Sequence, residues 1–179
     1  LHEQGLLSHT PYHGVELTAE GRQVALDVVR RHRLLETFLA EKVGLSWDEV
    51  HDEAERLEHH LSDRLEARLD SMLGFPDTDP HGDPIPDREG NFHPLNVIPL
   101  TLLADEQPAT IQRVIGQEPD LLRYLAEQGL TISTHIKVIS KAPFNGPINI
   151  RILGSKESTL ALGREVAEKI LLQPSADAH

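Results

Sequence analysis

Two short stretches of the sequence concentrate the residue types that bind divalent metal ions. Residues 51–59 read His-Asp-Glu-Ala-Glu-Arg-Leu-Glu-His. On a helix, at about 100° per residue, four of these side chains fall within one arc of about 100°: His51, Glu55, Glu58 and His59. Upstream, the pair at 32 and 36 repeats the His-x-x-x-Glu spacing. Two such helices packed together could enclose one or two ions, which predicts metal sensing or metal chemistry.

The alternative interpretation of these residues is a solvated, acidic helix surface. A single His-x-x-x-Glu pair would favour that alternative, and it remains the expectation for most of the other acidic residues between 48 and 70. Four ligand-type residues in one arc, together with His32 and Glu36, favour a metal site. The chain contains no Cys, so any metal is held by nitrogen and oxygen donors. Of the other histidines, His60, His81 and His93 are expected at the surface.

The composition restricts the class of protein. The chain has 179 residues, of which 39% are hydrophobic and 26% charged, as in a soluble globular protein. A formal net charge of −12 argues against nucleic-acid binding by this chain alone, because phosphate contacts need Lys and Arg. No apolar run approaches the ~20 residues of a membrane span, and no signal sequence opens the chain. We therefore expect a cytoplasmic protein with no membrane partner.

Sequence motifs for catalysis are missing. The helix at 51–59 lacks the His-Glu-x-x-His spacing of metallohydrolases. The sequence has no Gly-x-Ser-x-Gly elbow, no phosphate-binding glycine-rich loop and no Cys nucleophile. Several carboxylates in one site would also fill the coordination sphere of a metal ion. The sequence therefore predicts that the protein is not an enzyme.

Two helices are expected to carry the candidate ligands. Thr18 is a suitable N-cap for a helix that extends to about Lys42. Ser46, with Glu49 three residues later, forms a capping box for a second helix that extends to about Leu73. The apolar stripe of that helix lies beside the His/Glu face: Val50, Ala54, Leu57, Leu61, Leu65 and Met72. A wide stripe of this kind predicts burial in a core or in a dimer.

The rest of the chain divides at a proline-rich segment. Residues 1–5 look like the tail of a helix, and β-like runs at 6–9 and 15–17 predict a hairpin whose partner elements we expect to precede Leu1. Six of the twelve prolines lie between 74 and 99, which predicts a loop. The expected later elements are a possible strand at 96–103, a helix at 119–128, strands at 135–140 and 148–153, and a strand end with a short helix at 160–172. They predict a small β-barrel.

Three sequence stretches carry a family resemblance. They are Arg-His-Arg-Leu-Leu-Glu at 31–36, the run Val-His-Asp-Glu-Ala-Glu-Arg-Leu-Glu-His-His-Leu-Ser-Asp at 50–63, and Pro-His-Gly-Asp-Pro-Ile-Pro at 80–86. Together they resemble the diphtheria toxin repressor and manganese transport regulator family. The hairpin and residues 17–21 resemble that family's DNA-binding wing and the start of its linking helix. Residues 120–172, with Ala-Pro-Phe-Asn-Gly-Pro at 142–147, resemble its C-terminal SH3-like domain.

The resemblance implies a homodimeric, metal-activated transcriptional repressor that controls iron or manganese uptake. It implies two metal sites, an ancillary one formed by His32, Glu36 and His51 and a primary, activating one formed by Glu55, Glu58 and His59. In manganese-responsive members the positions of His32, Glu55 and Glu58 help to form a binuclear cluster. Iron-responsive members typically place Cys where this chain has Glu55. The resemblance therefore favours Mn²⁺, with Fe²⁺ second, and the hard carboxylate ligand agrees with that order.

The implied organisation is an α+β chain. Residues 1–18 would be the remnant of a winged helix-turn-helix, a partial DNA-binding region. Residues 19–74 would form the metal-binding and dimerisation helices, 75–110 a Pro-rich loop and linker, and 111–173 an SH3-like (FeoA-like) β-barrel. The implied function is metal-dependent transcription regulation of metal-ion homeostasis, with operator DNA bound through the winged helix-turn-helix of the complete protein. The alternative is a metal-storage or structural-metal protein without a regulatory role.

Overall fold

The chain folds into two compact units. The computed structural model describes residues 5–10, 14–154 and 157–175. One unit, here the helical unit, contains Leu1–Leu45, Val50–Asp79 and Pro84–His93. The other, here the sheet unit, contains Ser46–Glu49, Pro80–Asp83 and Pro94–His179. The predicted helix tail before Gly5 lies outside the described residues. None of the helices that the structure describes is both long enough and apolar enough to span a membrane.

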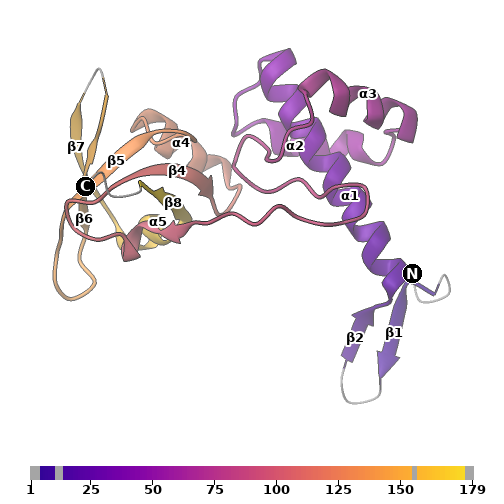
Figure 1. The fold of residues 1–179 in the computed structure, drawn as a ribbon, viewed down its shortest axis with the longest axis horizontal. Helices are drawn as coiled ribbons and strands as arrows, with labels where there is room; N and C mark the ends of the chain where they lie inside the picture. The colour runs from indigo at the N-terminus through magenta and orange to yellow at the C-terminus, as the bar shows by residue number, and fades with distance from the viewer. Residues whose placement is uncertain (1–4, 11–13, 155–156, 176–179) are drawn as a thin grey trace. The chain divides into compact units, whose positions relative to one another are not determined.

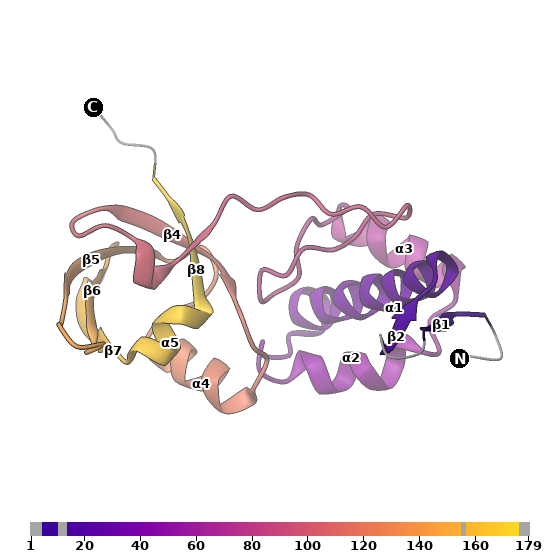
Figure 2. The ribbon, with the colours of Figure 1, turned by 90° about the horizontal axis from the view of Figure 1, so that it is seen from below.

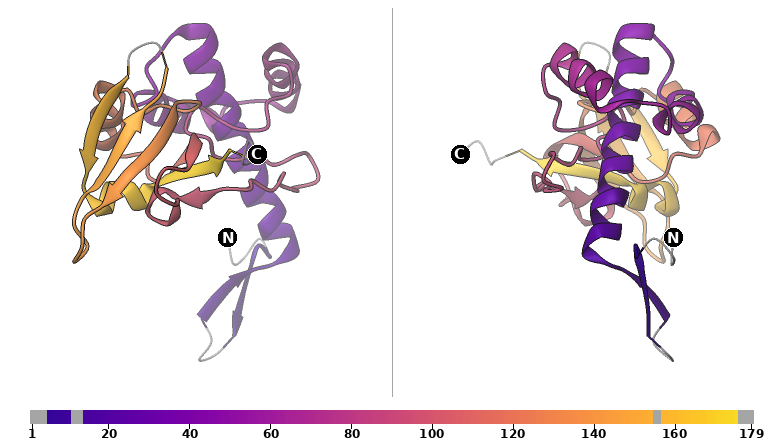
Figure 3. Two further views of the ribbon diagram at one scale, coloured as in Figure 1. Left: turned by 60° about the vertical axis from the view of Figure 1, so that its left-hand side comes forward. Right: turned by 90° about the vertical axis from the view of Figure 1, so that its right-hand side faces the viewer.

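A two-stranded hairpin leads into the first helix of the helical unit (Figures 1 and 3). Strands β1 (Leu7–Thr10) and β2 (Gly14–Leu17) pair antiparallel, as the sequence predicts. The base of the hairpin lies against the first turn of α1 (Ala19–Phe38), where a Cβ on Gly21 would lie only 2.0 Å from the carbonyl oxygen of Leu6. An isolated hairpin is marginally stable, so this contact with the helix supports it.

The predicted first helix agrees with the structure. The Oγ1 atom of Thr18 accepts a hydrogen bond from the backbone N–H of Gly21 at 3.0 Å, which caps α1. After Phe38 the helix continues as a π-helical turn, η1 (Leu39–Val43). Gly44 ends it in the left-handed conformation with φ 84°.

The predicted single helix from Ser46 to Leu73 is wrong, because the structure has two helices, α2 (Val50–Glu58) and α3 (Asp63–Leu73). One half of the capping box at Ser46 forms, in a turn before α2: the Glu49 carboxylate accepts from the Ser46 N–H at 3.2 Å. The Glu49 N–H donates to the backbone carbonyl oxygen of Ser46. The chain then leaves the helix after Glu58, and the Oγ atom of Ser62 accepts a hydrogen bond from the N–H of Leu65 at 3.4 Å. A second N-cap signal inside the apolar pattern therefore starts a new helix.

The three helices pack around a small apolar core (Figure 2). Its buried members are Leu35, Leu39, Val50, Ala54, Leu61 and Leu69. The break between α2 and α3 divides the predicted apolar stripe. Its members Val50, Ala54 and Leu61 are buried in this core, whereas Leu57, Leu65 and Met72 are exposed. The exposed half leaves an apolar surface on the helical unit.

The sheet unit contains a six-stranded antiparallel sheet in the order β3-β8-β4-β5-β6-β7. Its strands are β3 (Ile98–Pro99), β4 (Pro108–Val114), β5 (His135–Lys141), β6 (Ile148–Ile152), β7 (Ser158–Leu162) and β8 (Ile170–Pro174). Its helices are α4 (Pro119–Glu127), α5 (Arg164–Lys169) and the 3-10 turn η2 (Leu100–Leu102). Leu122 and Leu125 of α4 and Ala167 of α5 belong to the same buried core as the strands.

The expected closed β-barrel is wrong in one respect, because the six strands form an open sheet. Closure requires the two edge strands to pair, and among the described residues β3 and β7 do not. Strand β3 is only two residues long and gives way to η2, so the expected strand at 96–103 is mostly absent. Strand β4 starts inside the expected linker. Strand β8 takes residues 170–172, which the sequence pattern assigned to a helix, because three consecutive buried residues fit a buried strand.

Candidate metal centre

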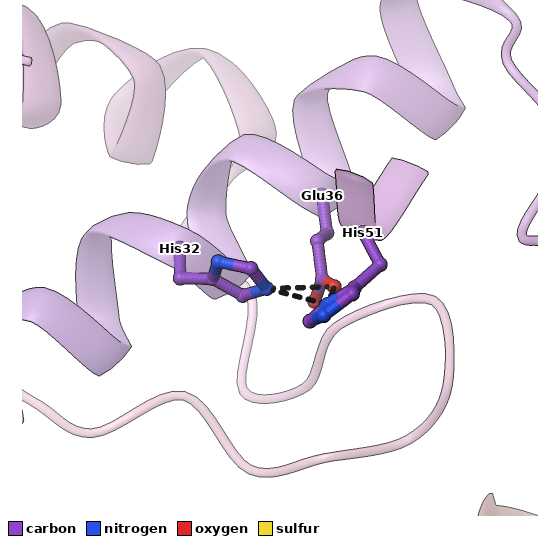
Figure 4. Close-up of side chains that lie close together, drawn as sticks. All are labelled: His32, Glu36 and His51. Atoms are coloured by element: carbon purple, nitrogen blue, oxygen red, sulfur yellow. Dashed lines mark hydrogen bonds and ion pairs between the residues drawn. The ribbon is translucent and has the colours of Figure 1, made fainter. Parts of the chain in front are cut away.

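Three of the predicted ligands meet where α1 packs against α2 (Figure 4). His32 and Glu36 lie one turn apart on α1, and His51 is the second residue of α2. The Nε2 atom of His32 lies 2.9 Å from Oε1 of Glu36 and 3.0 Å from Nδ1 of His51. That His51 nitrogen is 3.2 Å from the same Glu36 oxygen. One potential ligand atom from each residue therefore lies within 4.8 Å of the other two.

The site is recessed rather than spread over an acidic surface. The side chain of Glu36 is 0% exposed, that of His32 is 15% exposed and that of His51 is 35% exposed. A buried carboxylate is costly unless charged or hydrogen-bonding groups surround it. Two imidazoles face this carboxylate, and a divalent cation would complete the compensation. The solvated-surface interpretation does not fit these three residues.

Glu58 extends the cluster from α2. Its Oε2 atom lies 2.7 Å from Nδ1 of His32, and its side chain is 9% exposed. His59 lies next to it, with Nε2 at 3.4 Å from Oε1 of Glu58, but its side chain is 69% exposed. Glu55 is exposed on α2. Within the described ranges, neither Glu55 nor His59 belongs to a group of three potential ligands within 4.8 Å.

The electrostatics of the site centre on His32. Burial lowers the pKa of this imidazole, but hydrogen bonds and negative charge from Glu36 and Glu58 outweigh burial and raise it above 6.5. The protonated ring is therefore stabilised when no metal is bound, and a metal ion at a ring nitrogen must displace a proton. If His32 binds metal through Nε2, its Nδ1–H can donate to Glu58. Such a carboxylate fixes the orientation of a histidine ligand.

The structure corrects the expectation for one histidine. His81 was expected at the surface, yet it is 0% exposed, and its Nε2 lies 2.6 Å from the carbonyl oxygen of Trp47. His60 and His93 are exposed, as expected. The signal that could have identified His81 is its place in the Pro-His-Gly-Asp-Pro run, where two prolines and a glycine fix an unusual backbone path.

Two family descriptions match most of the chain. Residues 18–87 match "Iron dependent repressor, metal binding and dimerisation domain". Residues 98–174 match "FeoA domain". The first match contains all six predicted ligands, and the second contains every strand of the six-stranded sheet.

The chain is similar to characterised repressors over most of its length. It is 34% identical over 173 residues to the iron-dependent repressor IdeR of Mycobacterium tuberculosis (strain ATCC 25618 / H37Rv), covering 89% of this chain and 74% of the relative. It is 28% identical over 151 residues to the diphtheria toxin repressor of Corynebacterium diphtheriae, covering 79% of this chain and 67% of the relative.

Solved structures of transcriptional repressors are also similar to this chain. A manganese-dependent transcriptional repressor in complex with manganese has a TM-score of 0.87 and 44% identity, covering 98% of this chain and 80% of that one. The repressor ScaR with bound Cd²⁺ has a TM-score of 0.76 and 30% identity, covering 97% of this chain and 80% of that one.

A His/Glu cluster between packed helices, joined to a FeoA-type sheet unit, defines the class of metal-dependent regulators. The chain belongs to the family of iron-dependent and manganese-dependent transcriptional repressors that includes IdeR and the diphtheria toxin repressor. The family resemblance read from the sequence is confirmed.

Proposed function

We propose that this protein senses Mn²⁺, with Fe²⁺ as the second candidate, and couples metal occupancy to operator binding in the control of metal-ion homeostasis. The observation that carries the proposal is the convergence of His32, Glu36 and His51 within 4.8 Å between α1 and α2. A ligand-binding site can shift a conformational equilibrium only if the ligand binds the two states differently. A site built across two helices meets that requirement, because metal binding fixes their relative position.

The proposed ligands form two sites on the same pair of helices. The first contains His32, Glu36 and His51, and the second contains Glu55, Glu58 and His59. The contact between Glu58 and His32 supports placing the two sites next to each other. All these donors are carboxylate or imidazole, and hard oxygen donors suit Mn²⁺, which is at the weak end of the divalent affinity series. Selectivity must therefore come from the ion that produces the activating geometry.

We propose that the protein is a homodimer formed through the apolar surface of the helical unit. A hollow of about 290 Å³ lies on this unit, lined by Leu35, Phe38, Leu57, His60, Leu61, Leu65 and Leu69. Leu57 is 40% exposed and Leu65 is 51% exposed. Exposed apolar side chains around a hollow mark an interaction surface, and a second copy is the commonest partner in soluble oligomers.

The proposed organisation has a wing in 1–18, metal-binding and dimerisation helices in 19–74, a linker in 75–110 and an SH3-like (FeoA-like) domain in 111–173. The last part of the predicted linker, from β3 onward, lies in the sheet unit. The hairpin β1–β2 supports the wing, which would contact operator DNA as part of a winged helix-turn-helix. We propose that the protein acts as a non-enzymatic regulator in the cytoplasm.

Operator binding across a metal series tests the function. A full-length form of the protein should bind its operator with Mn²⁺ and release it with a chelator, and His51→Ala should weaken the metal response. Metal binding that raises the unfolding temperature without changing operator affinity would instead identify a structural or storage metal. Equal operator binding with and without metal would contradict the proposal.

A further inference from the structure

A buried arginine on α1 is bound to two other segments of the helical unit. The Arg30 side chain is 9% exposed. Its Nε–H donates to Oε1 of Glu66 at 3.0 Å and its Nη2–H to Oδ2 of Asp70 at 2.6 Å, and both carboxylates lie on α3. Its Nη1–H donates to the carbonyl oxygen of Pro86 at 2.7 Å. One guanidinium group therefore joins α1 to α3 and to the segment that follows α3.

The next residue of α1 adds a second contact with α3. The Nε–H of Arg31 donates to Oε2 of Glu66 at 3.0 Å, and its Nη2–H donates to Oδ1 of Asp63 at 2.7 Å. The Glu66 side chain is 12% exposed, and each of its two oxygens accepts from a different arginine. These five side chains are here called the Arg30 clamp: Arg30, Arg31, Asp63, Glu66 and Asp70. Its three carboxylates span about two turns of α3.

The Arg30 clamp contributes more to geometry than to stability. A buried ion pair is weak evidence for stability, because removing the charges from water costs about as much as their attraction returns. A guanidinium group, however, is planar and donates in fixed directions. Two neighbouring arginines and three carboxylates can therefore meet in this pattern at one register of α1 against α3. Apolar side chains alone would allow the helices to slide or rotate more easily.

The metal ligands of α1 lie on the other side of this helix. Arg30 and His32 are two residues apart, and so about 200° apart around the helix axis. His32 contacts Glu58 of α2 at 2.7 Å, while Arg30 contacts α3. A shift of α1 by one residue along its axis would move His32 by about 1.5 Å. Binding groups must be held within about 0.5 Å of their productive geometry, so such a shift would disrupt the site.

The register of α1 against α3 also fixes α1 relative to α2. A short, hydrogen-bonded connection joins α2 to α3: the N–H of His60 donates to the carbonyl oxygen of Leu57 at 3.0 Å. Ser62 then caps α3. Leu61, between the two helices, is 7% exposed and belongs to the apolar core that the three helices share. A clamp between α1 and α3 therefore acts on the interface between α1 and α2.

We propose that the Arg30 clamp positions the metal centre, with Arg30 as its central positioning residue. The clamp sets the register of α1 against α3, and so the distance of His32 and Glu36 from His51. This inference deepens the proposed function and rests on it. Groups that orient metal ligands change metal affinity by about 10- to 100-fold when they are removed. The lower end of that range applies here, because Arg30 acts through the position of a helix rather than by contact with a ligand.

The variant Arg30→Met/Asp70→Leu tests this positioning. It replaces a buried ion pair by apolar side chains, which typically preserves folding, and it leaves Glu66 paired with Arg31 at 3.0 Å. Arg22→Met is the matched control, because it makes the same substitution at an exposed position of α1. The readouts are Mn²⁺ affinity, from competition with a fluorescent chelator, the visible absorption spectrum of Co²⁺ at saturation, and the unfolding temperature.

The double variant should bind Mn²⁺ about 10-fold more weakly than the wild type. Its Co²⁺ spectrum should also change, because the ligands surround the ion at different angles. A loss of stability alone would lower the unfolding temperature without changing the spectrum of the saturated site. Arg30→Lys keeps the charge but loses the planar set of donors, so its Mn²⁺ affinity should lie between those of the wild type and the double variant. Arg22→Met should behave as the wild type.

An unchanged Mn²⁺ affinity and Co²⁺ spectrum in the folded double variant would overturn the positioning role. If the double variant does not fold, Asp70→Ala decides in the same way. That variant removes one contact of the Arg30 clamp and leaves Arg30 bound to Glu66 and to the carbonyl oxygen of Pro86.

A parallel measurement on His51→Ala separates this result from failure of the proposed function. If His51→Ala weakens Mn²⁺ binding and the clamp variants do not, the metal site stands and the positioning role is rejected. If His51→Ala binds Mn²⁺ as the wild type does, the metal site itself is wrong, and the positioning role falls with it.

Discussion

His32 Nδ1 and Glu58 Oε2 lie 2.7 Å apart, so the contact joins a residue of the proposed first metal site to a residue of the second. His32 comes from α1 and Glu58 from the last turn of α2. A change in the position of either side chain therefore affects the geometry of both proposed sites. The same Glu58 oxygen can orient the His32 ring when the other ring nitrogen binds metal.

Removing the Glu58 carboxylate should weaken metal binding at both sites. We expect Glu58→Ala to lower Mn²⁺ affinity by about 10- to 100-fold, because His32 loses its orienting partner and the second site loses a ligand. In a full-length form, activation should disappear with either Mn²⁺ or Fe²⁺. Isothermal titration with Mn²⁺ measures the change.

The control for Glu58→Ala is Glu53→Ala, which removes a carboxylate of the same helix that pairs with Arg56 at 3.0 Å. The control should bind Mn²⁺ as the wild type does. If metal activation survived in Glu58→Ala, Glu58 would not belong to the site.

Changing Glu55 to Cys should change the metal preference. A thiolate is a softer ligand than a carboxylate, so we expect Glu55→Cys to shift activation from Mn²⁺ toward Fe²⁺ or Co²⁺. Operator binding by a full-length form across a metal series measures the shift. Asp52→Cys, at another exposed position of α2, controls for the added thiol. An unchanged metal profile would remove Glu55 from the ligand set.

A charge in the apolar hollow should dissociate the dimer. Leu57→Glu and Leu65→Glu each place a carboxylate among the aliphatic side chains that line this hollow. Burying an unpaired charge at an interface is strongly unfavourable, so both variants should be monomers at micromolar concentration in analytical ultracentrifugation. Leu102→Glu, at an exposed position of the sheet unit, should remain dimeric. A monomeric wild type would contradict the proposed dimer.

The ion pair between Asp48 and Arg123 should stabilise the protein only above acidic pH. Hydrogen bonds from Ser46 and Arg123 hold the pKa of Asp48 below its usual 3.8 in the folded state. A lowered folded pKa gives stability that is present above pH 3.8 and is lost as the pH falls through the folded value. Because Arg123 is half exposed and solvent screens its charge, the contribution should be small.

Thermal unfolding of Asp48→Asn tests this pH dependence. At about pH 7 the variant should unfold at a lower temperature than the wild type, and the difference should shrink toward about pH 3. Asp105→Asn, at an exposed carboxylate of the same unit, should show little difference at either pH. A difference that is independent of pH would show that Asp48 acts through packing rather than through its charge.

The sequence by itself determined the family, the first helix and three residues that lie together between α1 and α2: His32, Glu36 and His51. His32 and Glu36 are one turn apart, and residue spacing within one helix depends only on helical geometry. The resemblance added that His32, Glu36 and His51 belong to one site. Local patterns also identified the cap at Thr18, the hairpin β1–β2 and strands β5 and β6.

Other features were decided only by the tertiary structure. The break between α2 and α3, strand β8 and the open edge of the sheet depend on which surfaces segments far apart in sequence can bury. The burial of His81 and the capture of Trp47 by α4 arise from contacts across more than thirty residues, at 34 and 75 positions apart in the chain. The spacing of apolar residues indicates which face of a helix or strand is apolar, but it does not indicate which other segment of the chain packs against that face. Packing between distant segments makes that choice, and here it places Trp47 against α4.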